Sequence, residues 1–184
     1  QTSSPALETL LDGKGIKCYV GFDPTAKSLH LGHLVPVMAL AFLQRAGHVP
    51  IVLLGGATGM IGDPSGRSKE RNLLTPETVK ENALGLRSQL ERFIRFEGPG
   101  AAVLVDNNDW IAPMSHVDWL REVGKHFSVN YMLNKESVRG RLREKASALT
   151  YTEFSYMLLQ AYDFVHLFDA MGCLVQAGGN DQWG

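Results

Sequence analysis

Cysteine is scarce in this sequence, and an excess of charge of one sign and long hydrophobic runs are both missing. The two cysteines, Cys18 and Cys173, form no zinc-binding or disulfide-framework pattern, so we expect two free thiols in a reducing compartment. The 18 basic and 19 acidic residues give a net charge of −1, which excludes a strongly basic nucleic-acid-binding surface over the whole chain but not a local patch. The longest apolar run, residues 34–43, includes a proline and is far shorter than the roughly 20 residues of a membrane span. The first residues show no secretion-signal pattern, the sequence starts with Gln instead of Met and so is either processed or cut there, and we expect no contact with a membrane.

Apolar residues and glycine are abundant. Hydrophobic residues make up 45% of the 184 residues and charged residues 20%, which argues against intrinsic disorder and predicts one folded domain. Five of the 19 glycines fall within residues 55–66, and three more fall within residues 178–184. Because glycine lets a backbone approach a ligand closely, we expect binding loops at both places.

Four short apolar runs predict buried strands, at residues 18–22, 49–54, 101–105 and 173–177. The helices expected between them cover residues 34–46, 75–96, 115–127 and 150–172, the last beginning at either Thr150 or Thr152. This alternation predicts an α/β fold with a doubly wound parallel sheet. The stretch of residues 111–149 is long for one crossover connection, so we expect it to hold an inserted helical hairpin.

Polar residues or glycines follow each of the four expected strands. Asp23 and Thr25 follow the first strand, the glycine cluster and Asp63 follow the second, residues 106–109 follow the third, and residues 178–182 follow the fourth. Ligands of parallel α/β sheets bind beyond the carboxyl ends of the strands. The sequence therefore predicts a binding site at this edge of the sheet.

His30 and His33 stand three residues apart just before the helix predicted for residues 34–46. No cysteine or carboxylate beside them completes a metal-ligand set. One interpretation is a surface or capping role for both side chains. The other is anion binding, because imidazole N–H groups and a helix N-terminus can bind phosphate oxygens, and Gly32 would let the backbone come close.

Two further polar groups each have a structural and a functional interpretation. Tyr156, Gln160 and Asp163 share one helix face, which is either solvated or, since aromatic residues surround it, the lining of a small-ligand pocket. The charged residues after the glycine cluster, which include Arg67 and Arg71, form either a solvated loop or a group that stabilises developing phosphate charge.

Four stretches taken together resemble the tyrosyl-tRNA synthetases of the bacterial and organellar type, which are class I aminoacyl-tRNA synthetases. These stretches are YVGFDPTAKSLHLGH, GGATGMIGDPSGRSKER, YMLLQAYDF and GGNDQWG. HLGH alone would also suit other class I synthetases. The last two stretches, YMLLQAYDF and GGNDQWG, narrow the resemblance to the tyrosyl-tRNA synthetases. It implies a Rossmann-like catalytic domain over residues 1–184, with the helical insertion at about residues 111–149. The KMSKS-type lysine loop and the C-terminal tRNA-binding domain of such enzymes are expected to be absent from these residues.

The resemblance implies activation of L-tyrosine by ATP, with Mg²⁺, to tyrosyl-adenylate, and transfer of the tyrosine to tRNA(Tyr), with little full activity for the fragment alone. The implied catalytic residues are Thr25, His30, His33, Arg67 and Arg71. The residues implied to bind tyrosine are Tyr19 and Asp163 at the phenol, Asp63, Tyr156 and Gln160 at the ammonium group, and Asn107 and Gln182. The residues implied to bind ATP are Gly21, Asp23, His30, Gly32, His33, Gly179 and Asp181. No metal-ligating residue and no tightly bound cofactor are implied.

The resemblance also implies a homodimer formed through the inserted region near Tyr151, in a bacterial cytoplasm or an organellar matrix. Val20 and Pro36 depart from the pattern of the family beside the ribose and ATP, and neither removes the core of the site. Two other functions compete: a non-catalytic fragment that binds tyrosine or RNA, and tryptophanyl-tRNA synthetase. Tyr19 with Asp163 favours a phenol over an indole, whose N–H is only a donor.

Overall fold

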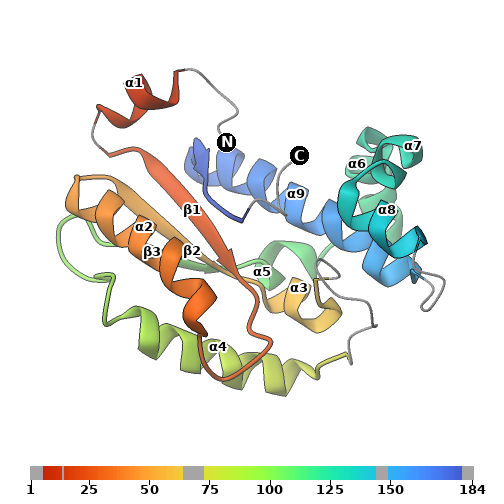
Figure 1. Ribbon diagram of the computed structural model, residues 1–184, viewed down its shortest axis with the longest axis horizontal. Coiled ribbons are helices and arrows are strands. Elements are labelled where there is room, and N and C mark those ends of the chain that lie inside the picture. Colours follow the sequence, from red (N-terminus) through yellow and green to blue (C-terminus); the bar gives the residue numbers. More distant parts are fainter. Residues whose placement is uncertain (1–5, 14, 64–72, 144–148, 180–184) are drawn as a thin grey trace.

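The computed structural model describes residues 6–13, 15–63, 73–143 and 149–179. Its helices and strands alternate up to β3, and a series of helices then separates β3 from β4 (Figure 1). In chain order they are α1 (Leu7–Leu11), β1 (Lys17–Phe22), the 3₁₀ helix η1 (Leu31–His33), α2 (Leu34–Arg45), β2 (Val49–Leu54), α3 (Gly56–Ile61), α4 (Pro76–Leu90), β3 (Val103–Asp106), α5 (Asn108–Ile111), α6 (His116–Glu122), the 3₁₀ helix η2 (Gly124–His126), α7 (Val129–Leu133), α8 (Glu136–Arg143), α9 (Tyr151–Met171) and β4 (Val175–Gln176).

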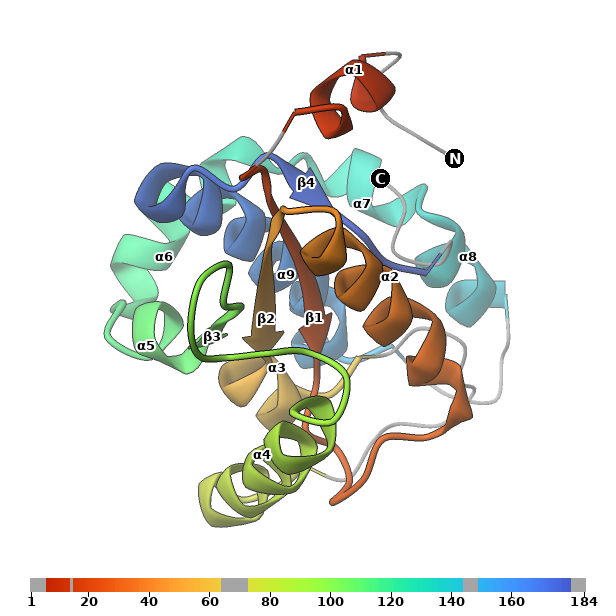
Figure 2. The same cartoon turned by 90° about the vertical axis from the view of Figure 1, so that its left-hand side faces the viewer.

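The four strands form one parallel sheet in the order β3-β2-β1-β4. The chain adds β2 and then β3 on one side of β1 and later returns to place β4 on the other side. Figure 2 shows α2 and α4 in front of the strands and α9 behind them. The predicted α/β fold with a doubly wound parallel sheet is therefore confirmed. Its change of winding direction falls between β1 and β4, where ligands bind in such folds.

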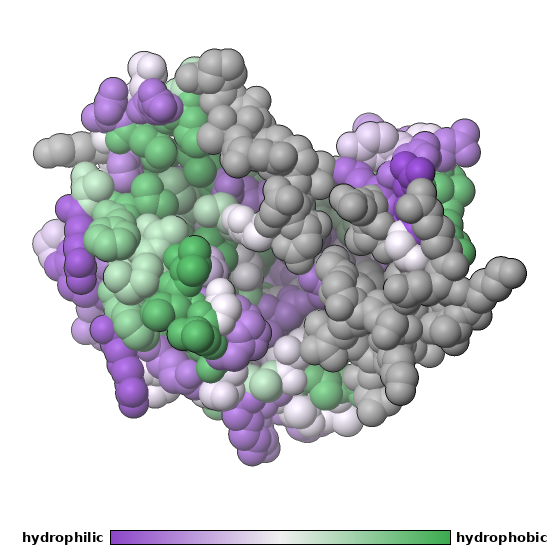
Figure 3. All heavy atoms as spheres, in the orientation of Figure 1, coloured by the Kyte–Doolittle hydropathy of each residue, from purple (hydrophilic) through white to green (hydrophobic). Residues whose placement is uncertain are grey.

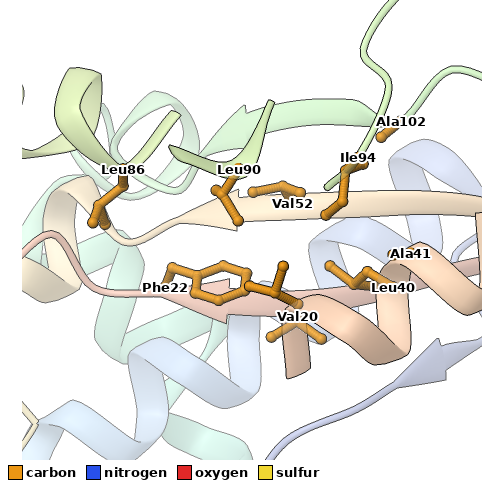
Figure 4. Close-up of a cluster of buried hydrophobic side chains, with 10 residues drawn as sticks. Val20, Phe22, Leu40, Ala41, Val52, Leu86, Leu90, Ile94 and Ala102 are labelled. Atoms are coloured by element: carbon orange, nitrogen blue, oxygen red, sulfur yellow. The ribbon is translucent and has the colours of Figure 1, made fainter. Parts of the chain in front are cut away.

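The larger hydrophobic core fills the space between the sheet and the helices α2 and α4 (Figure 4). Val20 and Val52 from the strands pack there with Leu40 of α2 and Leu90 of α4, all less than 5% exposed. A second cluster on the opposite face joins Tyr19 of β1 to α9 through Leu167. Both faces of the sheet are covered, which explains why the strand sequences are continuously apolar. Among the described helices, none is long and apolar enough to cross a membrane.

Several predicted boundaries agree with the structure because the sequence carries explicit capping signals. The Thr75 side chain accepts from the Thr78 N–H at the start of α4, and Ser115 does the same for Asp118 at the start of α6. Thr150, one of the two predicted first residues, forms a reciprocal capping box with Glu153 at the start of α9. Gly172 ends α9 in the left-handed conformation, with a φ of 65°.

Other boundaries were predicted wrongly. Helix α4 ends at Leu90 instead of continuing to residue 96. The reason is a tertiary contact: the buried Gln44 side chain of α2 donates to the Arg95 carbonyl at 2.8 Å and accepts from the Arg95 N–H at 2.9 Å. These bonds satisfy the Arg95 backbone outside a helix.

The remaining differences lie in the strands, in the inserted region and in the first glycine cluster. β3 spans Val103–Asp106 instead of residues 101–105, and β4 is shorter than predicted because it pairs with β1 only at Val175 and Gln176. The helix expected for 115–127 ends at Glu122 and is followed by η2, and the short helices α7 and α8 come after it. Residues 56–61 form helix α3, where the glycines had predicted a loop.

Candidate functional site

A cavity of about 960 Å³ opens beyond the carboxyl ends of β1 and β4. In Figure 3 the cavity is seen as a hollow on the face turned toward the viewer, and hydrophilic residues lie at its bottom. Every predicted site residue that the structure describes lines it: Tyr19, Gly21, Asp23, Thr25, His30, Gly32, His33, Asp63, Asn107, Tyr156, Gln160, Asp163 and Gly179. The other four predicted residues, Arg67, Arg71, Asp181 and Gln182, lie outside the described residues.

Tyr19 brings a buried hydroxyl group to the cavity from the middle of β1. The residue is 2% exposed, and its ring lies 5.9 Å from that of Phe164, centroid to centroid. Its hydroxyl oxygen has no hydrogen-bond partner within the described part of the chain. Burial, and next the charge of Asp163, raise the pKa of Tyr19, so the phenol stays neutral and can both donate and accept. A buried polar group without a partner is uncommon. Because Tyr19 lines the cavity, its hydroxyl group is placed to bond a ligand there.

Asp163 comes from the middle of α9, and two donors fix its carboxylate. Asn107 donates to Oδ2 at 3.0 Å, and the Trp110 indole donates to Oδ1 at 2.9 Å. Burial raises the pKa of Asp163 to about 7, although both hydrogen bonds act in the opposite direction. The carboxylate is therefore oriented before any ligand arrives, and it is a strong acceptor whenever it is ionised.

Asn107 connects this carboxylate to the rest of the cavity. The residue is fully buried directly after β3, and besides Asp163 it donates to the Thr58 hydroxyl at 3.0 Å. Its side-chain oxygen accepts from the Ala57 N–H at 2.8 Å. Its side-chain oxygen and nitrogen thus hold α3 and α9 in fixed positions around the cavity.

Asp23 lies at the other end of the same hydrogen-bonded network. It follows β1, accepts from the Thr58 hydroxyl at 2.6 Å, and accepts from the Tyr156 hydroxyl of α9 at 2.7 Å. Burial raises the pKa of Tyr156 well above its ordinary value, and the charge of Asp23 adds to this effect. The structure therefore joins a residue expected to bind the nucleotide to one expected to bind the amino acid.

The two histidines form a reciprocal pair at the cavity wall. The Gly32 N–H donates to Nδ1 of His30, and the His30 N–H donates to Nδ1 of His33, both at 3.1 Å. The rings lie 3.8 Å apart, centroid to centroid. Because each Nδ1 is an acceptor, the neutral rings carry their protons on Nε2. Burial lowers the pKa of His33, with a smaller contribution from His30, which favours this neutral form. Each histidine side chain can therefore accept a capping hydrogen bond at Nδ1 and still donate another hydrogen bond from Nε2.

The glycine cluster after β2 is needed for close packing inside a short helix. A Cβ atom on Gly55 would lie 1.9 Å from an Asp23 oxygen, and one on Gly56 would lie 2.1 Å from an Asp106 oxygen. Asp106 accepts the N–H of Gly56 at 3.0 Å and the N–H of Asn108 at 2.9 Å, so one side chain holds the first residues of both α3 and α5. The glycines were predicted to let the backbone approach a ligand closely. At Gly55 and Gly56 the groups that approach the backbone closely are side chains of the protein, those of Asp23 and Asp106.

Sequence reasoning missed three residues of the site. Thr58 and Trp110 hold Asp23 and Asp163, and Gln176 lines the cavity from β4. Gln176 could have been found, because it is the one polar residue inside the apolar run of residues 173–177. The described residues contain no group of three or more histidine, cysteine or carboxylate side chains placed to hold a metal ion.

Comparisons with known proteins agree on one family. The sequence model for "tRNA synthetases class I (W and Y)" matches residues 11–184. The chain is 55% identical over 183 residues to a protein named tyrosine–tRNA ligase of Desulfatibacillum aliphaticivorans, covering 100% of the chain and 42% of that relative. It is 57% identical over 184 residues to the protein of the same name from Opitutus terrae, covering 43% of that protein. The chain therefore spans less than half the length of these relatives.

Solved structures lead to the same family. A C-terminally truncated mitochondrial tyrosyl-tRNA synthetase of Aspergillus nidulans superposes with a TM-score of 0.81 at 34% identity, over 92% of this chain and 50% of that chain. A tyrosyl-tRNA synthetase of Archaeoglobus fulgidus, solved with L-tyrosine, superposes with a TM-score of 0.66 at 24% identity, over 96% of this chain and 50% of that chain. At this identity the likeness supports the fold alone. From the match over nearly all of its length and from these relatives, the chain belongs to the family of class I tRNA synthetases that contains the tryptophanyl and tyrosyl enzymes.

Proposed function

We propose that this chain binds L-tyrosine and ATP and forms tyrosyl-adenylate as the catalytic part of a tyrosine–tRNA ligase. One observation carries the proposal: the buried Tyr19 hydroxyl has no partner among the described residues, and it belongs to the same cavity as the fixed carboxylate of Asp163. A substrate phenol can donate to that carboxylate and exchange a hydrogen bond with Tyr19. Phenylalanine would leave both polar groups buried without a new partner, a form of discrimination for which tyrosyl-tRNA synthetase is itself the standard example.

The other cavity residues fit the remaining groups of the substrates. The ammonium group of tyrosine would lie near Asp63, Tyr156 and Gln160, which supply a carboxylate and neutral oxygens at the same cavity. Gln182 would bind beside the reacting carboxyl group, whereas Gly21, Asp23, Gly179 and Asp181 would hold the nucleotide. Mg²⁺ would arrive with ATP as part of that substrate.

The reaction needs charge stabilisation and positioning from the protein. A carboxylate oxygen of tyrosine attacks the α-phosphorus of ATP, the bond from that phosphorus to the bridging oxygen breaks, and pyrophosphate leaves with the electron pair. The Nε2–H groups of His30 and His33 would donate to the phosphate oxygens as negative charge develops on them. Thr25, Arg67 and Arg71 would add donors to the same phosphates. No proton has to be transferred in this step.

Further properties of the longer protein belong to the same proposal. Transfer of the tyrosine to tRNA(Tyr) would need regions that lie beyond the span shared with the relatives, and residues 1–184 would be the catalytic domain with its insertion at about 111–149. A homodimer through the inserted region is supported by exposed apolar side chains there, among them Val117, Val129 and Tyr131 and, at the start of α9, Tyr151. A bacterial cytoplasm or an organellar matrix suits two buried free cysteines.

The proposal is tested by exchange of labelled pyrophosphate into ATP, in a protein that carries this chain within the full length of its relatives. We expect exchange that depends on L-tyrosine and is not supported by L-tryptophan or L-phenylalanine. Exchange supported by tryptophan would instead assign the chain to the other enzyme of the family. Tyrosine binding without any exchange would favour a non-catalytic binding protein.

A further inference from the structure

The segment that follows β1 reaches across to α4 before it turns back to α2 (Figure 1). Residues 24–29 of this segment lie in no helix or strand, yet they carry Thr25 and end directly before His30. The fold must therefore fix the histidine pair through contacts other than the hydrogen bonds of regular secondary structure. Three residues on one face of α4, at positions 82, 85 and 89, provide such contacts.

Asn82 and Gln89 bind the backbone of the segment at both of its ends. Asn82, which is 3% exposed, donates to the Pro24 carbonyl at 2.9 Å. The Gln89 side chain accepts from the Leu29 N–H at 3.1 Å and donates to the Lys27 carbonyl at 3.2 Å. Gln89 is itself held by a bond of 3.1 Å to the Gly85 carbonyl, one turn earlier in α4. Polar groups of a segment without regular structure thus find their partners on a rigid helix.

Gly85 sets how closely the segment approaches α4. A Cβ atom at this position would lie 2.5 Å from the Lys27 carbonyl oxygen, a contact that side chains do not make. The nearest atom belongs to the backbone, so it could retreat only if the segment moved. The positions of the asparagine, the glycine and the glutamine are three and four residues apart, which places them on one face of the helix.

We propose that this face of α4, made of Asn82, Gly85 and Gln89, is a positioning element for the phosphate-binding residues. It holds residues 24–29 and thereby sets the positions of Thr25 and His30 relative to bound ATP. None of the three residues lines the cavity, whereas Tyr19 and Asp163 do. The proposal rests on the proposed function, and it predicts that ATP binding depends on α4 whereas tyrosine binding does not.

The most direct test replaces Gly85 with alanine, because this change removes no hydrogen-bonding group and forces the segment away from α4. Gly140→Ala is the matched control, since a Cβ atom at that helical position of α8 meets no described atom within 4 Å. We expect Gly85→Ala to raise the dissociation constant of Mg-ATP about tenfold in calorimetric titration, since small displacements of positioning groups have effects of this order. The dissociation constant of L-tyrosine should stay as in the control.

A second variant separates the hydrogen bonds from the steric effect. Gln89→Met keeps the volume of the side chain but loses the bonds to Leu29 and Lys27, so it should also weaken ATP binding and leave tyrosine binding unchanged. Equal ATP affinity in Gly85→Ala and Gly140→Ala would overturn the proposal. A parallel loss of both ligands would also overturn it, since it would mean a general role in folding.

Hydrogen exchange distinguishes failure of this proposal from failure of the proposed function. If a full-length protein that contains the wild-type chain binds tyrosine but not ATP, the nucleotide part of the proposed function is wrong. The positioning element is then judged by the exchange of the Leu29 and His30 amides. Faster exchange of these amides in Gly85→Ala than in Gly140→Ala supports it, and unchanged exchange refutes it.

Discussion

Tyr19→Phe should stabilise the free protein while it weakens tyrosine binding. The substitution removes one oxygen atom and leaves the ring, which packs in the core cluster beside Leu167 and Cys173. In the wild-type chain this oxygen is buried without a hydrogen-bond partner among the described residues. The folded state therefore carries an uncompensated desolvation cost that the variant does not have.

The two effects can be estimated from the same atom. An unpaired buried hydroxyl costs on the order of 1–3 kcal/mol, so the free variant should gain about 1 kcal/mol at the lower end of this range. For a chain of 184 residues this gain corresponds to a rise in Tm of about 2–4 °C. With tyrosine bound, the variant lacks one neutral hydrogen bond of about 1 kcal/mol. Together with the gain of the free variant, this weakens binding by about 2 kcal/mol, which is roughly a thirtyfold loss of affinity.

Thermal unfolding and calorimetric titration measure the two quantities on the same samples. Titration with L-phenylalanine is the control, because its ring offers nothing to the hydroxyl group, and its affinity should not fall in the variant. A lower Tm of the free variant would show that the hydroxyl has a partner in the folded protein. Unchanged tyrosine affinity would show that Tyr19 does not contact the phenol, and the reasoning on specificity would fail.

Three further predictions concern the network around the cavity. Asn107→Ala removes the bonds to Thr58 and Asp163 and leaves the Ala57 N–H buried without its acceptor. The free energy of unfolding, measured by urea denaturation, should therefore fall by about 3–5 kcal/mol, and a loss under about 1 kcal/mol would contradict the role of Asn107. Because the pKa of Asp163 is raised to about 7 from an ordinary 3.8, the native state keeps a proton that the unfolded state releases, and the free energy of unfolding should fall between about pH 4 and pH 7, by at most about 1.4 kcal/mol per pH unit. Asp163→Asn should flatten that slope in urea denaturation, and an unchanged slope would assign it to another group. Gly55→Ala, whose Cβ would collide with Asp23, should lower the Tm far more than Gly21→Ala, whose Cβ has its nearest neighbour at 3.8 Å; equal effects would show that the tight packing of α3 is not needed.

The sequence was sufficient for the architecture because the strands are buried on both faces. Continuous apolar runs located all four strands, and the second, Val49–Leu54, was predicted to the residue. Helix starts with Thr or Ser caps were also predictable, since the capping bonds are local. Where an end depends on a distant residue, as the end of α4 depends on Gln44, the local pattern carried no information about it.

The members of the site could be predicted, but the way they are held together could not. Strand ends and a helix face located Asp23, Asn107 and Asp163 in the sequence. Their hydrogen bonds to one another, to Thr58, to Trp110 and to Tyr156 join residues 35 to 133 positions apart, and no pattern in the sequence marks which residues pair. Helix α3 was missed for a related reason. Glycine disfavours helices, but the first N–H groups of this helix are held by the side chains of Asp106 and Asn107 at the end of β3.

The central claim is that the cavity recognises the phenol of tyrosine through Tyr19 and Asp163. Calorimetric titration of the wild-type chain and of Asp163→Ala, each with L-tyrosine and with L-phenylalanine, tests it most directly. The account predicts that the wild-type chain strongly prefers tyrosine, and that the variant loses this preference chiefly through weaker tyrosine binding. Equal losses for the two amino acids, or a wild-type chain that binds both equally, would contradict it.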